Sequence, residues 1–151
     1  MFLLAVFMAM PQANAQRTKF KGDNPEIRED VLAELRSFKH DFLKKELNLT
    51  PSQEAPFFKA YDEMDDQLMK IGSETRMLER NLLEKSNPTD TELESGARTI
   101  FEQKKKEGEI ELKYFEEFKK VLTKAQLVKL KSAERTMNRK IISYYRENRG
   151  N

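Results

Sequence analysis

Apolar residues between positions 57 and 82 recur at alternating spacings of four and three. This repeat places them on one face of an α-helix and is typical of a heptad seam, along which one helix packs against another. The seam residues are Phe57, Tyr61, Met64, Leu68, Ile71, Thr75, Leu78 and Leu82. We therefore predict a long helix that starts at Pro51, bends or is delayed at Pro56, and ends before Asn87 and Pro88.

Three more helices are predicted around this one. Asn24 and Pro25 suit the N-cap and the first position of a helix over residues 25–47. A third helix, over residues 90–120, starts with the capping box of Thr89 and Glu92. The fourth follows residue 123. Each of these helices has an apolar stripe, a row of apolar residues at helical spacing. In the helix over residues 25–47 it consists of Ile27, Val31, Leu35, Phe38 and Phe42. In the third helix it consists of Leu93, Ala97, Ile100, Phe101, Leu112, Phe115 and Phe118, and in the fourth of Leu127, Leu130, Met137, Ile141 and Tyr144.

The stripe of the third helix is the least regular. Lys104, Lys105, Lys106 and Gly108 interrupt it. Because glycine weakens a helix interior, Gly108 is expected to mark a bend or a close backbone approach.

The pentapeptide Leu-Thr-x-x-Gln occurs twice, at residues 49–53 and 122–126, each time just before a predicted helix. In each copy the threonine suits the N-cap, and the glutamine three residues later reaches back to the N-cap amide. The leucine before the threonine occupies the staple position. The residues that we assign as helix caps are Leu49, Thr50, Gln53, Leu122, Thr123 and Gln126.

The predicted fold is all-α, with four helices in a long antiparallel hairpin-like arrangement around the two long central helices. A turn at Asn87 and Pro88 brings the two motifs to the same end of this hairpin. Of the 151 residues, 38% are hydrophobic and 36% are charged, which leaves little apolar area for a compact monomeric core. We therefore expect a homodimer that buries the remaining apolar surface.

The first fifteen residues are typical of an export signal. An apolar stretch over residues 2–10 precedes the small-x-small cleavage pattern at residues 13–15, and the alternative is a buried helix. The chain contains no Cys, which rules out disulfides and thiolate metal sites. We expect a signal peptide over residues 1–15 cleaved near Ala15, a flexible leader over 16–23, a helical domain over 24–148 and a frayed tail at 149–151. The mature protein is then periplasmic, without membrane insertion.

No residue pattern indicates catalysis. His40 is the only histidine, and it lies between Lys39 and Asp41, so we expect a surface role for it. The five glycines form no phosphate-binding motif. The sequence therefore predicts no enzyme activity, no cofactor and no metal site.

Charge is distributed unevenly, although the formal net charge is only +2 and gives no case for nucleic acid as a partner. An acidic cluster in the second helix lacks the turn of a calcium loop, which favours a solvated surface. A basic series in the fourth helix could match it between helices or subunits. The lysine triplet at 104–106 favours an ordinary helix surface over contact with acidic lipid. The acidic cluster is Asp62, Glu63, Asp65 and Asp66, and the basic series is Lys129, Lys131, Arg135, Arg139, Lys140, Arg146 and Arg149.

Two identical capping motifs in a short helical chain after an export signal resemble the Spy/CpxP-like LTxxQ family of small periplasmic proteins. The resemblance covers nearly the whole chain after residue 15, although the irregular third helix and the connection at Asn87 and Pro88 depart from the usual pattern. It implies an antiparallel four-helix cradle that dimerises and acts as an ATP-independent chaperone or envelope-stress adaptor.

Several apolar residues lie beside the predicted seams. Such residues are usually core or dimer interface, and the functional interpretation is a shallow apolar surface rimmed by Lys and Arg that binds unfolded or misfolded proteins. The alternative functions are a regulatory ligand of a membrane-bound sensor protein, in stress or metal signalling, and a structural helical interaction module. The residues assigned to this client or dimer surface are Phe58, Met69, Met77, Leu83, Phe101, Phe118 and Tyr145.

Overall fold

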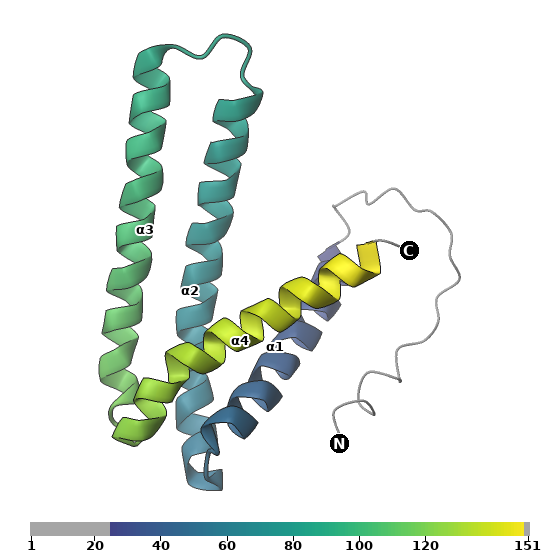
Figure 1. The fold of residues 1–151 in the computed structure, drawn as a ribbon, viewed down its shortest axis with the longest axis vertical. Helices are drawn as coiled ribbons and strands as arrows, with labels where there is room; N and C mark the ends of the chain where they lie inside the picture. The colour runs from purple at the N-terminus through teal and green to yellow at the C-terminus, as the bar shows by residue number, and fades with distance from the viewer. Residues whose placement is uncertain (1–24, 150–151) are drawn as a thin grey trace. The chain divides into compact units, whose positions relative to one another are not determined.

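The computed structural model describes residues 25–149, with side chains over residues 29–147. This part of the chain is all-α, as predicted, with four helices: α1 (Pro25–Leu47), α2 (Pro51–Glu84), α3 (Asp90–Phe118) and α4 (Lys124–Arg149) (Figure 1). The predicted signal peptide and leader, over residues 1–23, lie outside the described residues, as does the end of the predicted tail. None of the described helices combines the length and hydropathy needed to cross a membrane.

The chain divides after Leu35 into two units. The smaller unit ends at Leu35 and includes the part of α1 from Pro25 to Leu35. The larger unit begins at Arg36 and contains the rest of α1 together with α2, α3 and α4. The hydrophobic core lies entirely within this larger unit.

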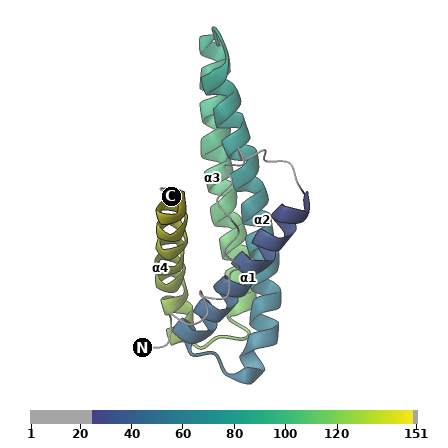
Figure 2. The same cartoon turned by 90° about the vertical axis from the view of Figure 1, so that its right-hand side faces the viewer.

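Helices α2 and α3 form an antiparallel hairpin (Figures 1 and 2). The connection contains Asn87 at φ 72°, a left-handed conformation that asparagine tolerates better than most residues. The start of α3 is a complete capping box: the Glu92 amide donates to Thr89 Oγ1 at 3.2 Å, and the Thr89 amide donates to Glu92 Oε2 at 2.9 Å. The predicted Asn-Pro connection and capping box are confirmed.

The predicted seam of α2 is confirmed. Four of its eight residues, at positions 57, 61, 64 and 71, are buried, and the other four are half-buried. Pro56 lies inside α2 without ending it. A proline this close to the helix start removes few intrahelical hydrogen bonds, which explains why α2 continues through it.

The core lies at the end of the hairpin where α2 begins and α3 ends, and all four helices contribute to it. At its centre the ring of Phe57 lies 5.3 Å from that of Phe118 and 5.5 Å from that of Tyr61. The half of the hairpin nearer to Asn87 contributes nothing to this cluster. The buried core residues are Phe42, Leu43, Leu47, Leu49, Phe57, Tyr61, Met64, Tyr114, Phe118, Leu122, Leu130, Ala133 and Met137.

The stripe predicted for α3 is mostly wrong. The buried residues of α3 are Gly96, Tyr114 and Phe118. At a turn of 3.6 residues, the face that they define is rotated by roughly 100° from the predicted stripe. Apolar residues occur on two faces of α3, so the sequence alone did not decide which face is buried. The structure buries the face that contains Gly96, where the absence of a side chain lets α2 approach. The predicted residues that lie exposed instead are Leu93, Ala97, Phe101, Leu112 and Phe115.

The close approach between α2 and α3 occurs at Gly96 and not at Gly108. A Cβ atom at position 96 would lie 2.3 Å from Leu82 Cδ1, with two further atoms of that side chain within 3.2 Å. A Cβ atom at Gly108 meets nothing within 4 Å. A methyl group at position 96 would therefore displace the side chain of Leu82, and the close backbone approach expected at Gly108 is wrong.

This contrast predicts opposite outcomes for two identical substitutions. Gly108→Ala is expected to stabilise the protein by about 1 kcal/mol, because alanine favours the helix and nothing obstructs its methyl group. Gly96→Ala is expected to destabilise it by up to about 2 kcal/mol, because displacing Leu82 costs about 1–3 kcal/mol and outweighs the roughly 1 kcal/mol that alanine gains in the helix. Urea unfolding followed by circular dichroism measures both, and equal effects of the two substitutions would contradict the assignment.

Candidate functional site

The two Leu-Thr-x-x-Gln motifs lie together at the end of the hairpin opposite Asn87, as predicted, and their glutamines contact each other directly. Gln53 Nε2 donates to Gln126 Oε1 at 2.9 Å, and Gln126 Nε2 donates to Gln53 Oε1 at 3.1 Å. Gln53 Nε2 also donates to the Val121 carbonyl at 2.9 Å. Gln126 Nε2 donates to the Leu47 carbonyl at 3.1 Å. We call this arrangement the glutamine pair.

The same glutamines cap their own helices. Gln53 Oε1 accepts from the Thr50 amide at 3.0 Å, and Gln126 Oε1 accepts from the Thr123 amide at 2.9 Å. The Thr123 hydroxyl completes its box by accepting from the Gln126 amide at 3.2 Å. The Thr50 hydroxyl is placed for a box, but its hydrogen bond is to Ser52 Oγ at 3.1 Å. The first copy is therefore capped through its glutamine.

Each glutamine side chain makes four hydrogen bonds, which is all that a primary amide offers. No donor or acceptor of the pair is left for a ligand. Leu49 and Leu122, the leucines of the two motifs, are buried in the core. The repeated motif is therefore a structural joint between the two halves of the chain.

Four of the seven residues assigned to a client or dimer surface are exposed. Leu83 is 84% exposed and Phe101 is 77% exposed, and Met77 and Tyr145 are also exposed. Met77 and Leu83 point about 120° apart around α2 at 3.6 residues per turn. The exposed members therefore do not form one continuous surface.

The other three residues of that group pack within the protein. Phe118 is only 3% exposed and belongs to the core, so its assignment to a surface is wrong. Phe58 and Met69 are half-buried. The ring of Phe58 stacks on His40 at a centroid distance of 4.0 Å.

An exposed apolar row runs along α3 in two groups, which Lys104, Lys105 and Gly108 separate, and we call it the α3 stripe. Its two most prominent residues are Phe101 and Leu112, which is 68% exposed. Its five residues fall within roughly 100° of the helix circumference. Exposed apolar side chains gathered on one face of a helix are typical of an interaction site. The α3 stripe consists of Leu93, Ala97, Phe101, Leu112 and Phe115.

The acidic cluster of α2 pairs with α1 and is not an independent solvated surface. Lys39 Nζ lies 2.6 Å and 2.8 Å from the two carboxylate oxygens of Asp65, and this pair is largely buried. Arg36 Nη2 donates to Asp66 Oδ1 at 2.6 Å. The predicted pairing of this cluster with the basic series of the fourth helix is therefore wrong within the chain.

His40 is also part of this interhelical contact. Its Nε2 atom lies 2.7 Å from Asp62 Oδ1, and one face of its ring covers Phe58. His40 therefore lies half-buried at the contact between α1 and α2. Its sequence neighbours, a lysine and an aspartate, gave no indication of this partner on another helix.

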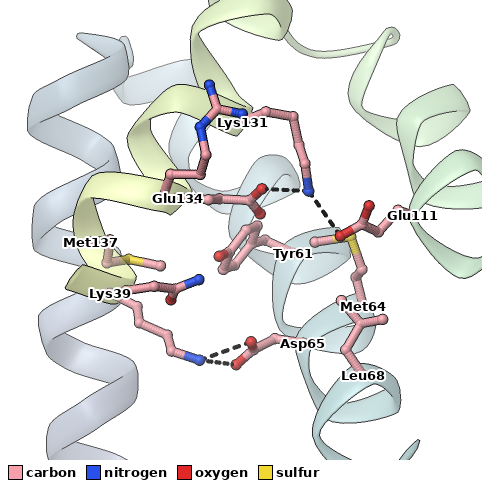
Figure 3. A pocket seen from close by; sticks show the side chains of 11 residues that line it. Lys39, Tyr61, Met64, Asp65, Leu68, Glu111, Lys131, Glu134 and Met137 are labelled. Carbon is pink, nitrogen blue, oxygen red and sulfur yellow. Dashed lines mark hydrogen bonds and ion pairs between the residues drawn. The ribbon is translucent and has the colours of Figure 1, made fainter. Parts of the chain in front are cut away.

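A polar pocket of about 150 Å³ lies among the four helices of the larger unit (Figure 3). Lys131 bridges two helices there, at 2.8 Å from Glu111 Oε1 and 2.9 Å from Glu134 Oε2. Burial lowers the pKa of Lys131, but the hydrogen bonds to these carboxylates outweigh it and raise the pKa overall. Lys131 therefore stays protonated.

Tyr61 forms one wall of this pocket (Figure 3). Burial raises the pKa of its hydroxyl, and the negative charges of Glu134 and Asp65 raise it further. The phenol therefore stays neutral, and the nearby cations Lys39 and Lys131 are already paired with carboxylates. The ion pairs of Lys39 with Asp65 and of Lys131 with Glu111 join neighbouring helices at this pocket.

No group of three or more His, Asp or Glu residues able to hold a metal ion occurs in the part of the chain that the structure describes. No protein-family model, curated protein or solved structure matches the chain. The α3 stripe is thus the feature of the described residues that most resembles a binding site.

Proposed function

We propose that the protein is an ATP-independent periplasmic chaperone or envelope-stress adaptor that holds unfolded or misfolded segments against the α3 stripe. The observation that carries this proposal is the exposed apolar row on α3. The twin capping motifs and the export-like N-terminal sequence support the same proposal through the resemblance to the LTxxQ family.

The stripe suits weak, reversible capture. Burying a Phe or Leu side chain is worth roughly 1.5–3 kcal/mol, and association costs several kcal/mol in lost freedom. A single row of side chains therefore supplies only a small surplus. Lys119 Nζ lies 5.6 Å from the centre of the Phe115 ring, so positive charge borders the row. Charge at the border speeds encounter while the small contact keeps the complex short-lived.

Light scattering of a reduced or heated test protein, without nucleotide, tests this function. The wild type is expected to suppress aggregation at near-stoichiometric amounts. Phe101→Ser with Leu112→Ser is expected to reduce the protection at least about tenfold, because each change removes an apolar contact worth roughly 1.5–3 kcal/mol. The matched control is Val128→Ser with Ile142→Ser, which also removes two exposed aliphatic residues but from α4.

Protection that survives in the α3 variant, or is lost equally in the α4 control, would contradict the assignment to α3. A second copy of the chain is the competing occupant of the stripe, in line with the homodimer expected from composition. Size-exclusion chromatography coupled to light scattering measures the oligomeric state and so distinguishes a client surface from a dimer interface. An α3 variant that becomes monomeric while protecting fully shows a dimer interface instead of a client surface.

A further inference from the structure

Helix α4 concentrates positive charge that the chain as a whole does not have. Among its 26 residues are eight Lys or Arg and two Glu, a formal charge of +6. The whole chain carries only +2, so the remaining residues together carry −4. Such asymmetry directs one face of a protein toward an anionic partner.

Helix α4 carries a narrow exposed row that we call the α4 face, and one of its members, Arg135, also borders the polar pocket. The six residues of this face are all exposed, and they fall within roughly 60° of the helix circumference, opposite the buried Leu130 and Met137. Val128 is 81% exposed and Ile142 is 57% exposed. The α4 face consists of Lys124, Val128, Arg135, Arg139, Ile142 and Arg146.

The four cations of this face have no carboxylate partner within the described residues. Arg139 donates to the neighbouring Thr136 hydroxyl at 3.2 Å, which leaves its charge uncompensated. The two acidic residues of α4 are occupied elsewhere, because Glu134 lines the pocket and Glu147 accepts from the Ser143 hydroxyl at 2.9 Å.

Two lysines of α3 behave differently. Lys104 pairs with Glu107, and Lys105 pairs with Glu109 at 3.6 Å. Part of the positive charge on α3 is thus compensated within the helix, whereas that of the α4 face is open to an external anion.

We propose that the α4 face docks the protein on the surface of a bilayer containing anionic phospholipid, with the helix parallel to the membrane plane. The face runs from Lys124 to Arg146, or roughly 33 Å at 1.5 Å per residue. Phosphate groups of the lipid meet the cations, while Val128 and Ile142 enter the boundary between headgroups and acyl chains. A single-stranded nucleic acid supplies the anions but prefers aromatic side chains for stacking, and the face has none. A duplex supplies them without an apolar boundary for Val128 and Ile142 to enter.

The affinity of this docking is expected to be moderate and salt-sensitive. Each Lys or Arg close to an anionic surface strengthens binding by about 1 kcal/mol, which is about fivefold. Surface charges are screened within about 10 Å at 0.1 M salt, so most of this gain disappears at high salt. Two aliphatic side chains add too little for permanent insertion.

Co-sedimentation of the full chain with vesicles tests the proposal. The probes are pure phosphatidylcholine vesicles and vesicles with 30% phosphatidylglycerol, each at low and high salt. The measured quantity is the ratio of the two partition coefficients, because the apolar stretch over residues 2–10 contributes to both. Arg139→Gln with Arg146→Gln is expected to lower this ratio roughly 25-fold, at about fivefold per cation.

The control is Lys70→Gln with Lys106→Gln, two exposed lysines outside the α4 face that make the same change in net charge. We expect this control to change the ratio less than about twofold. Val128→Ser with Ile142→Ser is expected to weaken binding to anionic vesicles while leaving its salt dependence intact. Circular dichroism of each variant establishes that the helices are retained.

Three outcomes would overturn the proposal. Equal losses in the arginine and lysine pairs would assign binding to net charge alone. Equal partitioning onto neutral and anionic vesicles would remove the electrostatic basis. Binding to soluble polyglutamate without binding to anionic vesicles would identify an acidic polypeptide as the partner of the α4 face.

Discussion

Phe57→Ala is expected to lower the free energy of unfolding by about 3–5 kcal/mol, the largest single effect in the molecule. Phe57 is fully buried, and its ring contacts those of Phe58, Tyr61 and Phe118. These rings belong to helices that meet at the motif end of the hairpin. Removing the Phe57 ring leaves a cavity, because the neighbouring aromatic side chains cannot move in to fill it.

Urea unfolding of the full chain, followed by circular dichroism, measures this loss. Phe101→Ala is the matched control, since it truncates the same side chain where it is 77% exposed, and a change within about 0.5 kcal/mol is expected. Similar losses at both positions would mean that the core does not lie where the structure places it.

Gln126→Ala is expected to lower the free energy of unfolding by about 2–4 kcal/mol, because it removes four hydrogen bonds and leaves partners at partly buried positions unsatisfied. The partners are the Thr123 amide, the Leu47 carbonyl and both polar atoms of Gln53. A glutamine that only capped its helix would cost about 1 kcal/mol. The excess over that value measures the contact between the motifs.

A double-mutant cycle isolates this contact. Gln53→Ala and Gln126→Ala together are expected to cost at least about 1 kcal/mol less than the sum of the two single losses, because each single variant already breaks the pair. Thr89→Ala supplies the control, since it removes a cap at the far turn and should add independently to either glutamine variant. Additive losses of the two glutamine variants would contradict a direct pair.

The helix boundaries and the seam of α2 were predictable because they depend on residues close in sequence. Thr89 and Glu92 specify the start of α3 within three residues, and Asn87 with Pro88 specifies the preceding turn. The α2 seam was unambiguous because only one face of that helix carries apolar residues at heptad spacing. These features need no knowledge of which helices become neighbours.

The glutamine pair was not predictable, because its two halves lie 73 residues apart in the chain. Each motif taken alone explains its glutamine fully as a cap. One signal in the sequence pointed to more than capping: both copies carry glutamine, although Glu serves the same capping role in Thr89–Glu92. Ionised Glu only accepts hydrogen bonds, whereas the amide of Gln both donates and accepts, as the reciprocal pair requires.

Charged contacts between α1 and α2 were missed for a similar reason. Lys39 and Asp65 each lie among other charged residues in the sequence, and such runs are usually solvated. Their burial depends on the crossing of two helices. The phase of α3 was misjudged because Gly96, which contacts Leu82, has no side chain to register in an apolar pattern.

The most direct measurement of the central claim places a photo-reactive benzophenone amino acid at position 101 and irradiates the protein with an unfolding client. The α3 stripe is proposed to hold that client, so a cross-link to it is expected, competed by excess unlabelled unfolded protein and absent with the same client in its folded state. Cross-links only between two copies of the chain, or none to the client, would contradict the proposed function.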